Sequence, residues 1–153
     1  MTIGNLRPAT VLIDETAILH NVQHEVARLK KQTQLFAVVK ADAYGHGMLR
    51  VAHVAKAAGA SGFCVALLDE ALDLRAANYT EPVLVLGIVP SQYAAIAAAQ
   101  TVSLPLSSVD WLKQALPVLE AQPELPPLRL HIALDTGMGR IGFTDDQTLL
   151  DAV

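Results

Sequence analysis

Short apolar runs alternate with stretches of helical periodicity along the chain, and this alternation constrains the fold more than any other feature. It is typical of βα units, in which each parallel strand is followed by a helix that packs back on the sheet. We predict strands over 9–14, 35–40, 63–67, 82–87, 101–106 and 128–134. We predict helices over 15–31, 48–58, 69–77, 91–99 and 108–116. The sequence therefore predicts an α/β fold built on a parallel sheet.

Residues that commonly begin or end helices support these boundaries. Gly59 is placed to end a helix in the left-handed conformation. Ser108 is placed to cap the start of a helix that Pro117 interrupts. The stretch 117–127 contains four prolines and has the composition of a linker. A capping-box pattern over 144–147 predicts the start of a further helix near the end of the chain.

The number of βα units points to a closed barrel. A (β/α)8 TIM-type barrel takes about 250 residues, so 153 residues supply about the first five units. Apolar residues make up 52% of the chain and charged residues only 17%, against a typical charged share of about 25%. We therefore expect an incomplete barrel whose apolar surface is covered, either by oligomerisation or by a larger protein of which this chain is part.

Charge, cysteine content and hydropathy exclude several classes of protein. The net charge of −4 argues against a nucleic-acid or anionic-membrane partner. The single cysteine, Cys64, leaves no internal disulfide and no cysteine-rich zinc site. No apolar run approaches the roughly 20 residues of a transmembrane helix, and no long apolar segment typical of a secretion signal begins the chain. We expect a soluble cytoplasmic protein.

The first candidate site follows the strand over 35–40. Lys40 lies where the carboxyl end of that strand is expected, which is where parallel α/β folds place reactive groups. Desolvation there disfavours the ammonium form and frees the amine for Schiff-base chemistry. Gly45 and Gly47 allow a ligand to approach the backbone, and the hydroxyl of Tyr44 suits a polar group such as phosphate. The alternative is a solvent-exposed lysine followed by a glycine turn.

The second candidate site follows the strand over 128–134. Three glycines in the run 137–142 allow the backbone to fold closely around a ligand, and Arg140 suits fork-like recognition of a carboxylate. A flexible loop with one surface arginine is the alternative.

Other chemically capable residues carry weaker signals. His20 and His24 are four residues apart on a helix, but no further metal ligand accompanies them, so we predict no metal site. Cys64 and Trp111 are expected to pack in the core, as is the alanine-rich run 94–99. His131 is expected to be an interior histidine rather than a catalyst. No dinucleotide-binding glycine motif and no P-loop is present.

Taken together, the two candidate loops resemble a known family. The run AVVKADAYGHG over 37–47 resembles the pyridoxal-phosphate attachment motif of the alanine racemases, which are fold-type III enzymes. The run DTGMGRIGF over 135–143 is similar to the second signature of that family. The resemblance extends along the whole chain, which would form about the first two-fifths of such an enzyme. Residues 1–153 would then be the N-terminal part of the pyridoxal-phosphate-binding barrel domain, and the β-rich C-terminal domain is absent.

The resemblance implies a role for three residues. Lys40 would be the catalytic residue, attached covalently to pyridoxal 5'-phosphate and acting as the base on one face of the substrate. Tyr44 would contact the cofactor phosphate, and Arg140 would hold the phenolic oxygen side of the cofactor and the substrate carboxylate. The implied reaction interconverts L-alanine and D-alanine, supplies D-alanine for peptidoglycan, and takes place in a homodimer.

The sequence departs from the family pattern in two places. The opposite base of the family is a tyrosine from the C-terminal domain of the partner subunit, and none of the tyrosines here, Tyr44, Tyr79 and Tyr93, has such a context. Ala133 stands where many members carry a carbamylated lysine, so the support of Arg140 must differ. We therefore expect the 153-residue chain to be inactive by itself.

Three alternatives remain open at the level of the sequence. A broad-specificity amino-acid racemase of the same fold would keep Lys40 and widen the substrate pocket. A non-catalytic barrel fragment would bind only a cofactor or a partner. A scaffold without a ligand is the third alternative, and the loops of Lys40 and Arg140 oppose it.

Overall fold

A five-stranded parallel sheet forms the centre of the computed structural model, which describes residues 8–150 and 152. The strands lie side by side in chain order, and each neighbouring pair is parallel. They are β1 (Phe36–Val38), β2 (Gly62–Val65), β3 (Val83–Val85), β4 (Val102–Leu106) and β5 (Arg129–Ile132). The predicted order of five successive βα strands from residue 35 onward is therefore confirmed.

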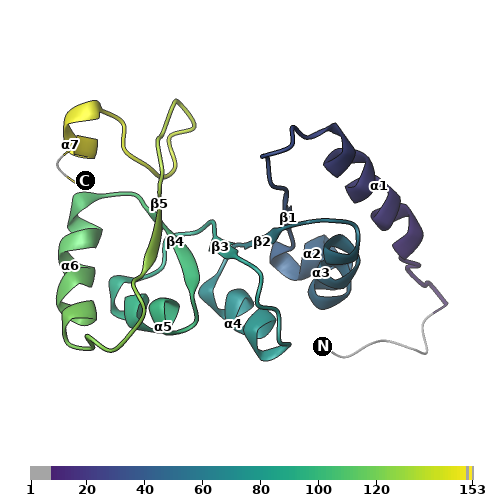
Figure 1. The fold of residues 1–153 in the computed structure, drawn as a ribbon, viewed down its shortest axis with the longest axis horizontal. Helices are drawn as coiled ribbons and strands as arrows, with labels where there is room; N and C mark the ends of the chain where they lie inside the picture. The colour runs from purple at the N-terminus through teal and green to yellow at the C-terminus, as the bar shows by residue number, and fades with distance from the viewer. Residues whose placement is uncertain (1–7, 151, 153) are drawn as a thin grey trace.

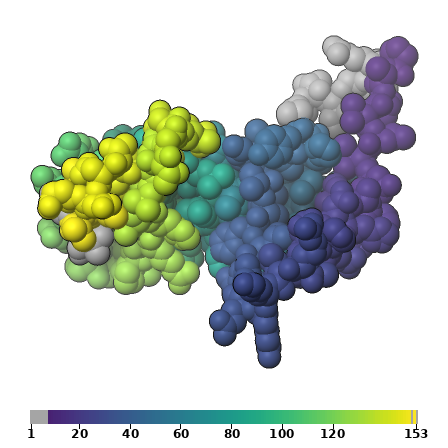
Figure 2. All heavy atoms as spheres, turned by 90° about the horizontal axis from the view of Figure 1, so that it is seen from above, coloured from purple at the N-terminus to yellow at the C-terminus, as the bar shows by residue number. Residues whose placement is uncertain are grey.

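Helices connect the strands and lie around the sheet in the same order (Figure 1). The helix before the sheet is α1 (Glu15–Arg28), and those between β1 and β3 are α2 (Lys40–Gly45), α3 (Met48–Ala57) and α4 (Leu68–Ala76). The later helices are the 3-10 turn η1 (Ser91–Tyr93), α5 (Ala94–Ala99), α6 (Val109–Glu120) and α7 (Asp146–Leu150). Figures 1 and 2 show α1 at one end of the molecule and the C-terminal segment at the other.

The core lies between the central strands and the helices that cover them. All four residues of β2 are buried, as expected for a parallel strand covered on both faces. The largest fully buried side chains include Phe63, Leu74 and Leu104. Trp111 is also buried, and its indole Nε1 donates a hydrogen bond to the carbonyl oxygen of Val89 at 2.6 Å. The predicted packing roles of Trp111 and of the alanine-rich run 94–99 are confirmed, because four of those alanines are buried.

The N-terminal strand over 9–14 was wrongly predicted. Residues 9–14 have no strand partner, and the side chains of Val11 and Leu12 are 83% and 88% exposed. A β-prone sequence becomes a strand only when a neighbouring edge pairs with its backbone. The helix that follows begins at Glu15 as predicted, with Asp14 accepting the N–H groups of Thr16 and Ala17, but it ends at Arg28.

Three other sequence expectations needed correction. Pro117 does not interrupt α6, which continues to Glu120 and thereby takes up the first part of the expected linker. The capping residue of α7 is Asp145, which accepts the N–H of Thr148 at 2.9 Å, so the helix begins after the expected position. His131 is exposed on β5 rather than interior, because β5 has no neighbour on its outer side in the described residues.

The sheet has two outer strands, β1 and β5, within the part of the chain that the structure describes. Both are more exposed than β2 and β4, and the side chain of Ile132 on β5 is 47% exposed. This arrangement is that of an incomplete barrel, as the number of βα units predicts. No helix among residues 8–150 is long and apolar enough to cross a membrane.

Candidate active site

Lys40 lies two residues after the end of β1 and begins α2, a turn of unusual conformation. The next four residues, Ala41 to Tyr44, all have positive φ angles between 51° and 57°. Left-handed backbone costs about 1–2 kcal/mol per residue for L-amino acids, and none of these four residues is glycine. Strain of this kind persists only where the surrounding structure holds it, and it occurs frequently at functional sites.

Several contacts hold this left-handed turn in place. The N–H of Ala43 donates to the carbonyl oxygen of Val39 at 2.9 Å, and the side chain of Ala43 is buried. The carboxylate of Asp42 accepts the N–H of Met48 at 2.8 Å, which ties the turn to the first residue of α3. The carboxylate of Glu70 accepts the N–H of Ala41 at 2.7 Å. The residue after the lysine is therefore fixed from a different helix.

The structure brings Lys40 and Arg140 together in one cavity. This cavity has a volume of about 310 Å³, and its other lining residues are Ala66, Leu86, Gly87, Ile88 and Ile141. Its walls come from the loops after β1, β2, β3 and β5, so the cavity lies at the carboxyl edge of the sheet. In a flat sheet β1 and β5 would be about 19 Å apart, because neighbouring strands are spaced by about 4.8 Å. Curvature of the sheet thus explains how loops from its two outer strands line one site.

The loop that carries Arg140 is organised by one carboxylate. Asp135 accepts the N–H groups of Gly137 and Gly139 on Oδ1, at 2.9 and 3.0 Å, and that of Arg140 on Oδ2 at 3.0 Å. These donors, above all the N–H groups of Gly139 and Gly137, lower the pKa of Asp135 below its ordinary value. At the base of the loop, Phe143 is buried and its N–H donates to the carbonyl oxygen of Ala133 at 2.8 Å. The Asp135 carboxylate and the backbone contact of Phe143 therefore organise this loop, to which the apolar side chain of Ala133 adds no polar contact.

Tyr44, the third predicted site residue, lies beside this cavity rather than in its lining. The Nζ of Lys40 is 6.0 Å from the centroid of the Tyr44 ring. The side chain of Tyr44 is 63% exposed. Its hydroxyl is therefore accessible to a ligand, but no described residue of the cavity wall positions it.

Glu70 is the site residue that sequence reasoning missed. Its carboxylate accepts the N–H of Ala41 on one oxygen and the N–H groups of Ala66 and Leu67 on the other, at 2.7 and 3.1 Å. An acidic residue at the third position of a helix often accepts the N–H of the residue before the helix, and this pattern is visible in the sequence of α4. The contact with Ala41 spans 29 residues and has no local sequence signal.

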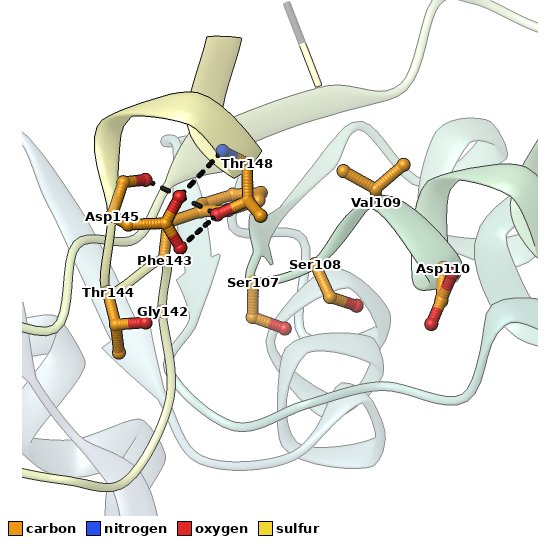
Figure 3. A pocket seen from close by; sticks show the side chains of 9 residues that line it. All are labelled: Ser107, Ser108, Val109, Asp110, Gly142, Phe143, Thr144, Asp145 and Thr148. Carbon is orange, nitrogen blue, oxygen red and sulfur yellow. Dashed lines mark hydrogen bonds between the residues drawn. The ribbon is translucent and has the colours of Figure 1, made fainter. Parts of the chain in front are cut away.

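A second cavity, of about 340 Å³, lies between the start of α6 and the start of α7 (Figure 3). Ser107 and Ser108 lie on one side, and Thr144, Asp145 and Thr148 lie on the other. Both oxygens of the Asp145 carboxylate bind Thr148, through its N–H at 2.9 Å and its hydroxyl at 2.7 Å. Ser108 and Asp145 serve as helix caps, so we assign no ligand to this cavity.

The remaining chemically capable residues lie outside the Lys40 cavity. Cys64 is buried in β2, and burial raises the pKa of its thiol, so its predicted role as a core residue is confirmed. His24 lies 3.4 Å from the carboxylate of Glu25 on the exposed surface of α1. Among the described residues no three histidine, cysteine or acidic side chains cluster in a way that could hold a metal ion.

The sheet and its cavity define the class of protein: a partial (β/α) barrel with a lysine and an arginine at the mouth of its strands. Residues 13–153 match the family described as alanine racemase, N-terminal domain. The chain belongs to this family, and the resemblance noted in its two loops is thereby confirmed.

Individual relatives agree with this assignment. The chain is 87% identical over its whole length to an alanine racemase of Lacticaseibacillus casei, of which it covers 40%. The crystal structure of an alanine racemase from E. faecalis superimposes with a TM-score of 0.92 at 46% identity, over 99% of this chain and 41% of that one. A histidine racemase from Leuconostoc mesenteroides superimposes with a TM-score of 0.81 at 37% identity, over 90% of this chain and 36% of that one. The chain thus spans about two-fifths of the length of the relatives it matches.

Proposed function

We propose that this chain is the N-terminal part of an alanine racemase, and that the complete protein interconverts L-alanine and D-alanine with pyridoxal 5'-phosphate. The observation that carries the proposal is the cavity shared by Lys40 and Arg140 at the carboxyl edge of the sheet. Membership of the alanine racemase family and the 87% identity to the L. casei enzyme support the choice of reaction. Residues 1–153 then form the N-terminal part of the cofactor-binding barrel domain.

The donor set of the cavity fits pyridoxal phosphate. The cofactor carries an aldehyde, which requires a primary amine, and anionic oxygens, which require hydrogen-bond donors. Lys40 supplies the amine, and the guanidinium of Arg140 supplies charged donors in the same cavity. The exposed hydroxyl of Tyr44 is a further donor beside it. We therefore assign cofactor attachment to Lys40, phosphate contact to Tyr44, and binding of the substrate carboxylate to Arg140.

When bound, pyridoxal phosphate withdraws electrons from the α-carbon of an attached amino acid and makes its α-proton removable. The task of the chain is then to hold the substrate and to move that proton. Lys40 reaches the cavity from the carboxyl end of β1, and its Nζ would accept the proton on its own face. Arg140 approaches from the loop after β5 and fixes the carboxylate, which orients the α-carbon toward Nζ.

Racemisation also requires proton transfer on the opposite face. None of the three tyrosines of the chain, Tyr44, Tyr79 and Tyr93, is among the residues that line the Lys40 cavity. The hydroxyl of Tyr79 donates instead to the carbonyl oxygen of Leu49 at 3.1 Å. We propose that the second proton-transfer group comes from outside this chain.

We further propose that the protein acts in the cytoplasm as a homodimer and supplies D-alanine for peptidoglycan. Family membership supports these statements. The outer strands and exposed apolar residues of the barrel segment support burial of its surface in a larger assembly.

The exchange of the alanine α-proton for deuterium tests the proposed reaction. With the complete gene product, pyridoxal phosphate and L-alanine in deuterated water, we expect D-alanine to form with deuterium at its α-carbon. The Lys40→Ala variant is expected to lose the activity by at least about a thousandfold, because both cofactor attachment and one proton transfer depend on Nζ. D-alanine formation at the native rate in that variant would contradict the proposal.

A second candidate is a racemase with another or a broader range of amino acids. The structural similarity to a histidine racemase at 37% identity favours keeping this candidate. Rates with L-alanine and L-histidine, measured side by side, distinguish the two. A kcat/KM for L-histidine equal to or above that for L-alanine would replace alanine as the proposed substrate.

A further inference from the structure

The loops that form the Lys40 cavity are joined by one carboxylate that lies outside it. Glu70 is the third residue of α4 and is half-buried. Its Oε1 accepts the N–H of Ala41 at 2.7 Å, and its Oε2 accepts the N–H of Ala66 at 2.7 Å. Ala41 follows Lys40 in the chain, and Ala66 is itself part of the cavity wall. One side chain thus connects the lysine turn to the neighbouring wall of the cavity, which follows β2.

The hydrogen bond from Ala41 to Glu70 lies at the start of the strained left-handed turn that follows Lys40. Ala41 is the first of the four residues with left-handed φ angles, and its N–H belongs to the peptide group that joins it to Lys40. Without an acceptor for that N–H, the strained turn has one fewer contact to oppose its return to ordinary backbone angles. Such a return would rotate the peptide group and redirect the side chain of Lys40.

The loop after β3 forms a third wall of the cavity, and it packs against the segment that contains Ala66. A Cβ atom at Gly87 would lie 2.5 Å from the carbonyl oxygen of Ala66. The backbone of the loop after β3 therefore packs closely on the segment that Glu70 binds. Displacement of Ala66 would change the contact with Gly87, and both residues line the cavity.

We propose that Glu70 is a positioning residue for Lys40: by binding Ala41 with one oxygen and Ala66 with the other, it holds Nζ in the cavity. This inference rests on the proposed role of Lys40. Glu70 does not line the cavity and is not assigned any contact with cofactor or substrate.

The rate at which the apoprotein captures pyridoxal phosphate tests this role. In that step Nζ of Lys40 forms a double bond to the aldehyde carbon, and the aldehyde oxygen leaves as water with two protons of the amine. The complete gene product is stripped of cofactor and mixed with pyridoxal phosphate, and the visible absorbance of the bound form is followed over time. Borohydride reduction and mass spectrometry then quantify the label on Lys40.

Two variants remove the bridge in different ways. Glu70→Gln keeps the length of the side chain, but its amide nitrogen cannot accept an N–H, so one of the two walls is released. Glu70→Asp keeps the negative charge at the start of α4 and is one methylene too short to reach both walls. Asp69→Asn is the matched control, because it removes the same charge from the same helical turn and no hydrogen bond to the cavity.

We expect capture to slow by about tenfold or more in both Glu70 variants, equivalent to about 1.4 kcal/mol, and to remain within about twofold of native in the control. The kcat for racemisation is expected to fall with capture, while KM for alanine stays near the native value. The thermal unfolding midpoint is expected to fall further in Glu70→Gln than in Asp69→Asn, because of the two residues only Glu70 accepts backbone N–H groups of the cavity segments.

Several outcomes would overturn the proposal. Native capture rates in both Glu70 variants would show that the bridge does not position Lys40. Failure of both variants to fold would assign Glu70 to overall stability instead. If Lys40→Ala captured pyridoxal phosphate as fast as the native protein, the proposed role of Lys40 would fail, whatever the Glu70 variants do.

Discussion

At the scale of single residues, Lys40 and Arg140 are the basic side chains of the cavity, and carboxylates that accept backbone N–H groups hold the segments that carry them. Lys40 depends on a left-handed turn, and Arg140 depends on a loop organised around Asp135. Because Ala133 has no polar side chain with which to support Arg140, the position of the guanidinium rests on this loop. Changes at single residues should therefore separate cofactor attachment from substrate binding.

Replacement of Arg140 by lysine is expected to weaken substrate binding more than cofactor attachment. Lysine keeps the charge but cannot form the paired hydrogen bonds that a guanidinium forms with a carboxylate. We expect KM for alanine to rise by about tenfold, equivalent to about 1.4 kcal/mol. Steady-state kinetics on the cofactor-saturated protein measure this change. An unchanged KM would exclude Arg140 from binding the carboxylate.

The loop of Asp135 is expected to lose its order in acid. Its pKa is below the ordinary value because backbone N–H groups stabilise the carboxylate, so the folded loop favours the charged form. The resulting stabilisation is complete above the ordinary aspartate pKa of about 3.9 and is lost as the pH falls through the lower folded pKa. The amide NMR signals of Gly137 and Gly139, followed during acid titration, measure this loss. A midpoint above the ordinary value would contradict the assignment.

At the scale of elements, Arg75 near the end of α4 links the segments that lead into β3 and β4 at the amino edge of the sheet. Its guanidinium donates to the carbonyl oxygens of Tyr79 and Glu81 in the connection to β3, and to those of Gln100 and Thr101 before β4. One side chain thereby links two successive βα units on the face opposite the cavity. Residues on that face of a barrel commonly serve stability rather than catalysis.

Replacement of Arg75 by methionine is expected to destabilise the fold by about 2–4 kcal/mol, because four carbonyl groups lose a charged donor. Arg75→Lys should recover part of this loss. Arg50→Met is the control, since Arg50 forms an exposed ion pair with Glu15 at 3.2 Å, and such pairs contribute about 0–1 kcal/mol. Urea unfolding of the complete gene product measures all three. Equal effects of the Arg75→Met and Arg50→Met changes would contradict this interpretation.

The elements could be predicted from the sequence where their signals are local. The apolar runs and helix caps indicated five parallel strands in chain order, and Gly59 ends α3 with a φ of 104° as expected. The strand over 9–14 was wrong because pairing depends on a neighbour that local sequence does not reveal. Pro117 was misjudged because α6 continues to Glu120 even though Pro117 cannot donate a hydrogen bond to the preceding turn.

The candidate site could also be predicted only in part, because only some of its features have a local sequence signal. Lys40 and Arg140 both follow strands, and parallel strands present their carboxyl ends at one edge, so their proximity was foreseeable. The left-handed turn was not, because alanine, aspartate and tyrosine ordinarily disfavour positive φ angles. The hydrogen bond from Ala41 to Glu70 could not be predicted either, since it joins two elements that meet only in the tertiary structure.

At the scale of the whole molecule, the chain forms one wall of a barrel and, in the proposed reaction, would supply one of two proton-transfer groups. Its outer strands expose apolar residues, among them Ile132 and Leu134, at 47% and 58%. Its described residues place Lys40 in the cavity and no tyrosine in the lining. Under the proposed function, racemisation would need a second proton-transfer group that the lining of this cavity does not supply.

The isolated 153-residue chain is accordingly expected to form no D-alanine from L-alanine when supplied with pyridoxal phosphate. The physical reason is that a proton removed on the Lys40 face must be replaced on the other face by a second group. Chiral chromatography of the reaction mixture provides the measurement, with the complete gene product as the positive control. Turnover by the purified 153-residue chain would contradict this expectation.

The site of cofactor attachment tests the central claim most directly. The complete gene product is loaded with pyridoxal phosphate, reduced with borohydride and digested, and the labelled peptide is identified by mass spectrometry. We predict that the label lies on Lys40 and is absent from the other lysines of the chain, such as Lys56 and Lys113. A label on another lysine, or no label at all, would contradict the assignment of this cavity as the racemase active site.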